Sequence, residues 1–445
     1  MKKRIFALCL LLIPFSGFGQ SRLDKDGTLV VNDQRRFILG TYHNPGELSG
    51  LLELAQNGIN LVRCGADAMS LDQARTAGLF AWVNTGANLD LSENPAERKQ
   101  NLLAMAAALK DHPALVVWEA PDEALWNLYY PNLEKQLHRS DLTEARLDSL
   151  LKDLEQNSRR LADGFQKGLA VLRQGNPHRP VWFNHAPRNS IEQLKPFSSL
   201  ADIIGCDIYP VRVGHNGHSD LIDKDLSCVG AYTDRMQASG PNKPVWMVLQ
   251  AFSWEQLTSK KPEEMDPQGF PSFNESRFMA YEAILHGARG LLWWGSTLSS
   301  TKAAFCKAIL AVTSELAELE PYLVAPELKK QLTVEPLTFA ASEPSRVAYS
   351  FRRHQNDYLL ILSTEDNGQW VRVDGLQRLN GRAFYDVAGG RRHMVQQGRL
   401  LLSPQSRLSV LCTDRQWELV QPNPFPAAWD RFSRHPLKEI EDNRR

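Results

Sequence analysis

The feature that most constrains this chain is an alternation of short apolar runs with longer stretches of helical spacing, from about Phe37 to Tyr322. Such alternation is typical of parallel βαβ units. Eight strands are expected, at Phe37–Tyr42, Ile59–Cys64, Leu79–Asn84, Leu115–Trp118, Val181–Asn184, Ile203–Tyr209, Val245–Gln250 and Gly290–Trp294. The expected helices between them include Glu47–Asn57, Pro95–Lys110, Asp141–Gln174 and Ser276–His286. The pattern predicts an α/β fold, a (β/α)₈ TIM barrel over residues 37–325.

An open, doubly wound parallel sheet is the alternative fold. Such sheets usually have fewer strands and often carry a Gly-rich phosphate-binding turn after the first one. No G-x-G-x-x-G motif follows the first apolar run here. The closed barrel is therefore the preferred prediction.

The rhythm changes after Pro321, where short β-rich segments alternate with turns such as Asn380–Gly381 and Gly389–Gly390. This pattern predicts a small antiparallel β-sandwich over residues 326–414, packed on the barrel as a cover rather than binding sugar itself. Residues 20–36 are expected to form an N-terminal β-hairpin, and residues 415–445 a charged, partly disordered tail.

The first residues have the pattern of a targeting segment. Lys2, Lys3 and Arg4 precede an apolar stretch, Ile5–Phe15, and small residues follow it. We interpret residues 1–19 as a cleavable signal peptide, which predicts a secreted or periplasmic protein. No later run approaches the roughly 18 apolar residues of a membrane span, so no membrane insertion is expected after signal removal.

Composition limits the partners. The chain has 51 basic and 51 acidic residues, so it lacks the excess of positive charge that nucleic acid binding needs, and a neutral substrate fits better. Five cysteines remain beyond the signal segment, an odd and scattered set that does not indicate a disulfide framework. No Cys/His cluster has zinc spacing, and His215 and His218 in a Gly-rich loop are weak evidence. No metal and no cofactor are predicted.

The end of the fourth expected strand carries the clearest chemical signal, because functional groups of such barrels lie at the C-terminal ends of the strands. It reads Trp118-Glu119-Ala120-Pro121-Asp122-Glu123, with three carboxylates, and Trp126, Tyr129 and Tyr130 follow. Aromatic faces beside carboxylates suit sugar stacking and raise carboxyl pKa values by desolvation. A partly protonated Glu is the general acid that glycosidic cleavage needs. Glu123 is the predicted proton donor, with Trp118 and Glu119 as substrate contacts.

These residues resemble the large retaining clan of barrel glycoside hydrolases that includes β-mannanases, cellulases and β-galactosidases. The fourth strand of the clan ends in Trp-Glu-x-x-Asn-Glu, which residues 118–123 match except at Asp122. The resemblance implies that Arg63 supports the site, that Tyr209 lies near the reacting sugar, and that Trp293 or Trp294 provides a sugar platform. It covers residues 37 to about 320.

The seventh strand departs from the clan. There the strand ends in a nucleophilic Glu, whereas Gln250 occupies that place here, and an amide cannot be that nucleophile. Three explanations stay open: an inverting enzyme with Asp207 as the second carboxyl, substrate assistance by a 2-acetamido group with Asp122 and Glu123 as the paired acids, or a sugar binder without turnover. Glu255, five residues further on, is a remote candidate nucleophile.

Other polar side chains at strand ends are candidate sugar contacts, since buried polar groups need partners. They are Tyr42, His43, Asp67, Asn84, Asn184, His185 and Gln250. Trp293 and Trp294 are adjacent on a strand, so only one of them can face the pocket. Trp126 and Trp254 are expected in loops, as outer sugar subsites or as cover for the core. The sequence thus predicts an exported glycoside hydrolase acting on a neutral glycan or oligosaccharide; the alternative is a non-catalytic carbohydrate-binding protein on the same barrel.

Overall fold

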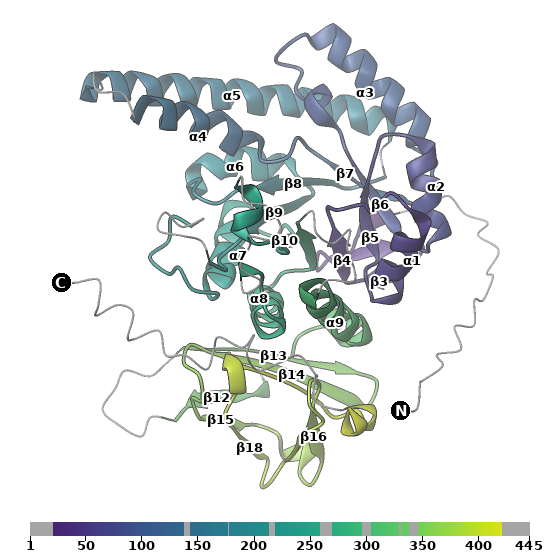
Figure 1. Ribbon diagram of the computed structural model, residues 1–445, viewed down its shortest axis with the longest axis vertical. Coiled ribbons are helices and arrows are strands. Elements are labelled where there is room, and N and C mark those ends of the chain that lie inside the picture. Colours follow the sequence, from purple (N-terminus) through teal and green to yellow (C-terminus); the bar gives the residue numbers. More distant parts are fainter. Residues whose placement is uncertain are drawn as a thin grey trace.

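A closed barrel of parallel strands forms the centre of the computed structural model, which describes residues 21–137, 143–176, 178–212, 219–258, 269–295, 304–328, 331–337 and 346–420. The hydrogen-bonded order is β10-β11-β4-β5-β6-β7-β8-β9 (Figure 1). The eight strands are β4 (Ile38–Thr41), β5 (Leu61–Cys64), β6 (Phe80–Asn84), β7 (Leu115–Glu119), β8 (Val181–His185), β9 (Ile203–Ile208), β10 (Val245–Gln250) and β11 (Gly290–Trp294). The predicted (β/α)₈ barrel is confirmed, and each strand lies at its predicted place.

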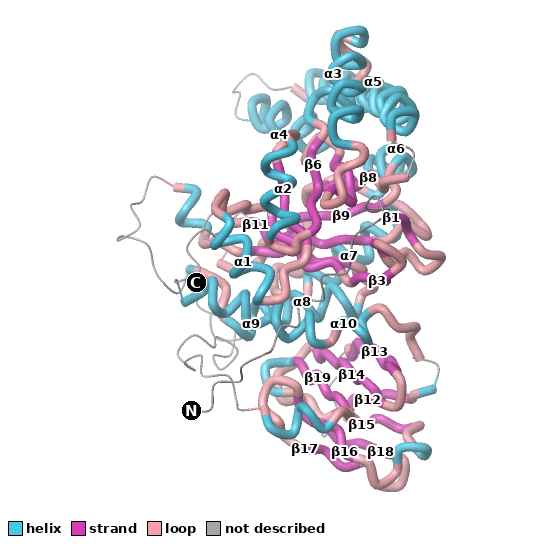
Figure 2. Tube along the Cα trace, turned by 90° about the vertical axis from the view of Figure 1, so that its right-hand side faces the viewer, coloured by secondary structure: helices cyan, strands magenta, loops and turns pink. Residues whose placement is uncertain are grey.

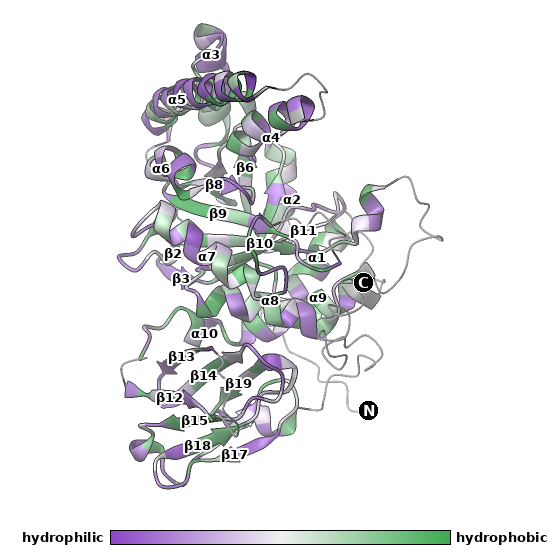
Figure 3. Ribbon diagram, turned by 90° about the vertical axis from the view of Figure 1, so that its left-hand side faces the viewer, coloured by the Kyte–Doolittle hydropathy of each residue, from purple (hydrophilic) through white to green (hydrophobic). Residues whose placement is uncertain are grey.

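The barrel strands separate two hydrophobic cores, because successive side chains of a strand point to opposite faces. Large inward side chains such as Trp82, Trp182 and Trp246 fill the barrel interior. Their neighbours Val83, Phe183 and Met247 belong to the layer between strands and helices. Strands β9 and β10 are strongly hydrophobic and the long helix α5 is mostly hydrophilic (Figure 3), as expected for buried strands and a largely exposed helix.

Helices surround the barrel. They are α1 (Leu48–Gln56), α2 (Ala68–Thr76), α3 (Pro95–Leu109), α4 (Ala124–Leu137), α5 (Glu144–Gly175), α6 (Ile191–Leu200), α7 (Cys228–Ser239), α8 (Phe273–Leu285), α9 (Ala304–Glu318) and α10 (Glu320–Leu323). The helix predicted at Asp141–Gln174 is α5, which begins after the N-cap Thr143, whose side chain accepts from the Arg146 amide. Helix α4 was not predicted. Together α4 and α5 extend side by side beyond the barrel (Figure 1).

Three short antiparallel strands precede the barrel: β1 (Ser21–Leu23), β2 (Leu29–Val31) and β3 (Gln34–Arg36). The expected hairpin corresponds to β2 and β3, and β1 adds a third strand. Leu29 and Val31 belong to the same core as the inward side chains of the barrel, and the Ser21 hydroxyl donates to the Val116 carbonyl. This small sheet therefore covers one end of the barrel interior.

The C-terminal region is the predicted β-sandwich, with α8, α9 and α10 between it and the barrel strands (Figure 2). One sheet has the order β12-β15-β18 and the other β13-β14-β19-β16-β17. The strands are β12 (Thr333–Pro336), β13 (Val347–His354), β14 (Asp357–Thr364), β15 (Val371–Asp374), β16 (Ala383–Asp386), β17 (Arg392–Met394), β18 (Arg399–Leu402) and β19 (Leu408–Cys412). Residues 415–419, predicted as tail, form a 3₁₀ helix whose Trp417 is buried.

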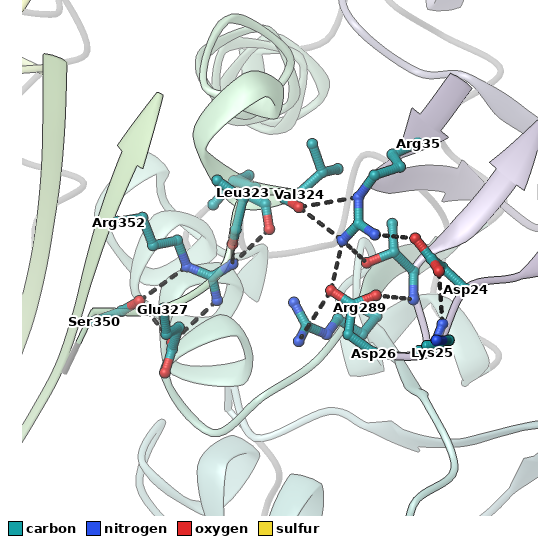
Figure 4. A network of polar contacts seen from close by, with 12 residues as sticks. Asp24, Lys25, Asp26, Arg35, Arg289, Leu323, Val324, Glu327, Ser350 and Arg352 are labelled. Atoms are coloured by element: carbon teal, nitrogen blue, oxygen red, sulfur yellow. Dashed lines mark hydrogen bonds and ion pairs between the residues drawn. The ribbon is translucent and has the colours of Figure 1, made fainter. Parts of the chain in front are cut away.

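Two arginines hold the turn that joins barrel and sandwich (Figure 4). Arg35, from the N-terminal sheet, donates to the Val324 carbonyl. Arg352, from β13, is 3 % exposed and donates to the carbonyls of Leu323 and Ala325. These contacts satisfy carbonyl groups at the end of α10, which the helix itself leaves without partners.

The described residues include five cysteines. Cys64, Cys206, Cys228, Cys306 and Cys412 are all free and buried. Within the described ranges, no helix has the length and apolar character needed to cross a bilayer.

Candidate active site

A cavity of about 410 Å³ lies at the C-terminal ends of the barrel strands, within the size range of ligand pockets. It is lined by Tyr42, Asp122, Glu123, Trp126, Asn184, Ala186, Asp207, Tyr209, Phe252, Trp254, Leu257 and Trp294. The lining therefore joins carboxyl groups with a large area of aromatic surface.

Glu123 enters this cavity through an unusual backbone conformation. Its φ angle is +49°, in the left-handed region that residues other than glycine seldom adopt. Its amide donates to the Asn184 carbonyl at 3.2 Å, and its carbonyl accepts from the Asn127 amide at 2.9 Å in the first turn of α4. The loop after β7 is thus fixed on both sides of Glu123. Strained conformations held in this way concentrate at functional sites.

Three carboxyl groups share the cavity, and their pKa values are linked. Burial raises the pKa of Glu123, the negative charge of Asp122 raises it further, and a hydrogen bond from Asp207 partly offsets the rise. Burial also raises the pKa of Asp207 well above its ordinary value, and the charges of Glu123 and Asp122 add to the rise. A carboxyl group that retains its proton near neutral pH is what general acid catalysis requires.

Asp122 is held in place by its neighbours. The Asn184 amide donates to its Oδ1 at 3.0 Å, and the Tyr42 hydroxyl lies 3.5 Å from the same atom. Burial raises the pKa of Asp122, and these two hydrogen bonds oppose the rise. Oδ1 of Asn184 is buried and accepts no hydrogen bond from the described residues. A ligand in the cavity could donate to it.

Glu119 lies beneath the cavity rather than in its wall, and it is 0 % exposed. It accepts hydrogen bonds from Tyr42 at 3.0 Å, Asn84 at 2.7 Å and Trp82 at 3.2 Å, and the Arg63 guanidinium lies 3.6 Å away. Burial, followed by the charge of Asp122, raises its pKa to about 7. Because protein groups surround Glu119, this position does not suit the predicted contact with substrate. Arg63 also lies over the Tyr42 ring, 5.4 Å from its centroid.

Gln250, at the end of β10, makes its hydrogen bonds to the backbone. Its Oε1 accepts from the Val211 amide at 2.8 Å, and its Nε2 donates to the carbonyls of Val211 and Phe252 at 3.0 Å each. The side chain is 0 % exposed and does not line the cavity. It fastens the segment after β9, which carries Tyr209, to β10.

Aromatic rings form one wall of the cavity. Tyr209 stacks on Trp294 with ring centroids 5.7 Å apart, and it meets Phe252 edge to face at 5.0 Å. Trp254 contacts Phe252 at 5.2 Å. Of the two adjacent tryptophans at the end of β11, Trp294 faces the cavity and Trp293 packs in the outer layer.

Several predicted contacts lie elsewhere. Trp118 and Trp293 are fully buried in the outer core. His185 follows the outward Phe183 by two residues, so it points away from the cavity, and burial lowers its pKa to about 4. Each of the three follows directly after a residue whose side chain faces the barrel interior or the cavity, and successive side chains of a strand point to opposite faces. Their placement therefore does not suit substrate contact.

Other candidates have local roles or no place in the lining. Asp67 caps α2 by accepting from the Ser70 amide. His43 and Glu255 are only partly buried, and neither lines the cavity. Trp126 belongs to α4 and Trp254 to the 3₁₀ helix η2 (Trp254–Leu257), so the expectation that both lie in loops was wrong. His215 and His218 lie outside the described residues.

Sequence reasoning missed three of the lining residues, Ala186, Phe252 and Leu257. Phe252 had a usable signal, because it lies two residues after Gln250 and so continues the inward phase of β10. The same signal was available for Ala186, which lies two residues after Asn184, whereas nothing in the local sequence indicated Leu257.

Comparisons with known proteins agree with this architecture. No family model matches the chain, and no curated protein matches its sequence. Among solved structures, one described as a glycoside hydrolase is 12 % identical with a TM-score of 0.56, over 88 % of this chain and 96 % of that one. The chain shares its fold with glycoside hydrolases.

Two further structures support the same conclusion about the fold. A glycoside hydrolase family 5 structure from Bacteroides vulgatus is 13 % identical with a TM-score of 0.56, over 92 % of this chain and 98 % of the other. A β-galactosidase from Bacillus circulans sp. alkalophilus is 10 % identical with a TM-score of 0.52, over 85 % and 99 %. At these identities the likeness extends to the fold and not to the reaction.

Proposed function

We propose that the protein is a glycoside hydrolase that acts on a neutral glycan or oligosaccharide, with Glu123 as the proton donor. One observation carries this proposal: Glu123, Asp122 and Asp207 open into the same cavity as Tyr209, Trp254 and Trp294. Aromatic faces stack on sugar rings, and a carboxyl group with a raised pKa protonates the leaving oxygen. The fold shared with glycoside hydrolases supports the proposal.

The reaction we propose does not pass through a glycosyl ester on β10, because Gln250 is an amide and is engaged by the Val211 backbone. Asp207 and Asp122 are the remaining carboxyl groups of the cavity. Asp207 lines the same cavity as Glu123, and burial together with the charges of Glu123 and Asp122 raises its pKa well above the ordinary value. Inversion would therefore require Asp207 to lose its proton and to lie roughly 6.5–9.5 Å from Glu123 when a sugar binds. Asp122, fixed by Asn184 and Tyr42, is placed to orient a substrate's own 2-acetamido group.

The test compares wild type with Glu123→Gln on a panel of neutral β-linked oligosaccharides. We expect wild type to release reducing sugar and the variant to release at least about 100-fold less, since general acid catalysis contributes roughly 10²–10⁴-fold. Binding of the same oligosaccharides should change little. NMR of the first product then narrows the choice of the second group: inversion supports Asp207, and retention supports either the 2-acetamido group oriented by Asp122 or Glu255 as nucleophile.

A carbohydrate-binding protein without turnover is the second candidate, and Gln250 is the observation that favours it. If wild type binds an oligosaccharide of the panel and releases no reducing sugar, this candidate replaces the first. We also propose that the chain is exported, from the pattern of residues 1–19, which lie outside the described residues. N-terminal sequencing of the protein recovered from periplasm or medium tests this: a mature chain that still begins at Met1 would contradict it.

A further inference from the structure

Helix α4 connects the cavity to the surface. It begins at Ala124, directly after Glu123, so its first turn rises from the rim of the cavity. Trp126 lies in that turn and lines the cavity. A residue three positions after Glu123 is about one helical turn away from it. Any ring that stacks on Trp126 therefore lies next to the proposed proton donor.

Trp126 is part of a fixed aromatic pair. Tyr130 follows it by four residues, on the same face of the helix. The two ring centroids are 5.6 Å apart and the planes differ by 23°, which is a stacked arrangement. Both side chains are partly buried. One face of the indole is therefore covered by a neighbour that is itself an aromatic ring.

The pair is fastened to a second element. The Tyr130 hydroxyl donates to the Arg188 carbonyl at 2.8 Å, and the Arg188 guanidinium lies 5.9 Å from the centre of the Tyr130 ring. Arg188 belongs to the segment between β8 and α6, which also carries Asn184 and Ala186 in the cavity lining. Two walls of the cavity thus meet at this pair, and contacts within the protein hold its geometry. Such pre-organisation reduces the entropic cost of binding.

The position relative to Glu123 assigns the pair to one side of the scissile bond. A general acid must reach the oxygen that leaves, so the sugar unit attached to that oxygen lies beside the acid. The rings of Tyr209, Phe252, Trp254 and Trp294 lie at or just beyond the ends of β9, β10 and β11, which are two to four strands away from β7, the strand before α4, in the closed order. The cavity therefore presents aromatic surface on both sides of the carboxyl cluster.

We propose that Trp126, backed by Tyr130 and Arg188, forms a leaving-group subsite that stacks on a neutral sugar ring. The substrate is then an oligosaccharide or polysaccharide with a sugar on each side of the cleaved bond, rather than a glycoside of a small alcohol. The assignment of this subsite to the leaving group rests on the proposed function. The binding of a second sugar ring at Trp126 does not depend on that function.

Binding as a function of chain length tests the subsite. In the Glu123→Gln background, which prevents turnover, calorimetry measures the affinity for gluco-, manno-, xylo- and galacto-oligosaccharides of one to six units. We expect affinity in the best-bound series to rise between one and three units. Trp126→Ala should reduce the affinity for the trisaccharide by about tenfold, consistent with an aromatic contact, and that for the monosaccharide by less than about twofold.

Two further variants serve as controls for this binding test. Trp126→Phe retains a ring and should preserve most of the rise with length even if the alanine variant unfolds. Trp370→Ala removes a tryptophan that is 45 % exposed on the sandwich, and it should leave every affinity unchanged. The inference fails if wild-type affinity does not depend on length, if Trp126→Ala weakens the monosaccharide and the trisaccharide equally, or if no oligosaccharide binds.

The two proposals can fail separately. Release of reducing sugar by wild type without any effect of Trp126→Ala on length dependence leaves the glycosidase standing and removes the subsite. Length-dependent binding that Trp126→Ala abolishes, in a protein that never releases sugar, establishes the subsite and removes the enzyme.

Discussion

Glu119 shows how a buried carboxyl group makes the stability of the site depend on pH. Its pKa is raised to about 7, chiefly by burial, so the folded chain holds this proton more tightly than the unfolded chain does. The contribution of this group to the free energy of unfolding is therefore greatest below its unfolded pKa. It falls as the pH rises, and it is fully lost above the folded pKa of about 7.

We expect Glu119→Gln to flatten this dependence. A Gln side chain can still accept from Asn84 and Trp82 and can donate to the Tyr42 hydroxyl. Between pH 5.5 and pH 8.5, the free energy of unfolding measured with denaturant should fall by about 1–2 kcal/mol more in wild type than in the variant. Equal falls in both proteins would contradict a folded-state pKa of about 7 for Glu119. Glu97→Gln, the same change at an exposed position on α3, serves as control.

Gln250 has a structural role at the end of β10. Its amide matches both the amide and the carbonyl of Val211, a pairing that a carboxylate cannot make. We expect Gln250→Glu to lower the free energy of unfolding at pH 7.5 by about 2–4 kcal/mol and to create no new hydrolysis. Denaturant unfolding and the reducing-sugar assay measure the two effects. A Gln250→Glu variant with full stability or increased turnover would contradict this role. Gln174→Glu, the same change at an exposed site on α5, is the matched control.

At the scale of elements, some features were predictable from the sequence and others were not. The difference depends on whether a feature is set by neighbouring residues or by contacts with distant ones. The strands were predictable because their apolar runs reflect burial that every barrel strand shares. The inward phase of β7, β8 and β11 depends on register, so Trp118, His185 and Trp293 were assigned to the cavity from proximity to a strand end alone. Helix α4 was hidden by Pro131 within it and by an aromatic content that also suits a loop.

The packing of α5 on the barrel depends on two glycines one turn apart. A Cβ atom at Gly168 would lie 1.9 Å from the Leu89 carbonyl oxygen, and one at Gly164 would lie 2.0 Å from Oδ1 of Asp90. Both contacts are with η1 (Gly86–Leu89) and the residues that follow it, after β6. The helix can approach this segment so closely only where side chains are absent.

We therefore expect Gly168→Ala to destabilise the protein by about 2–3 kcal/mol, although alanine favours a helix, because backbone must move to admit the methyl group. Thermal unfolding followed by circular dichroism measures the loss. Gln174→Ala, an exposed position on the same helix, should have almost no effect or a slight stabilising one. A stabilised Gly168→Ala variant would mean that α5 does not pack on this segment.

At the scale of the whole molecule, the sandwich is joined to the barrel by polar contacts as well as apolar ones. Ser363 of β14 donates to Glu282 of α8 at 2.8 Å, and Arg407 pairs with Asp225, in the segment between β9 and α7. The Arg407 guanidinium also lies 4.6 Å from the centre of the Phe278 ring. The sandwich thus contacts helix α8 and the segment that follows β9. The sandwich is therefore packed on the barrel through these contacts.

Arg352 joins β13 to the linker between barrel and sandwich. It is 3 % exposed, donates to two linker carbonyls and pairs with Glu327 at 3.0 Å. Removing it leaves buried acceptors without partners, so Arg352→Ala should cost about 3 kcal/mol. Since barrel and sandwich meet here, wild type should unfold in one calorimetric transition and the variant in two, with the sandwich first. Arg353→Ala, next to it on β13 but exposed, should retain one transition. Two transitions in wild type would mean that the domains unfold independently. Arg352 would then stabilise the linker without coupling the unfolding of the two domains.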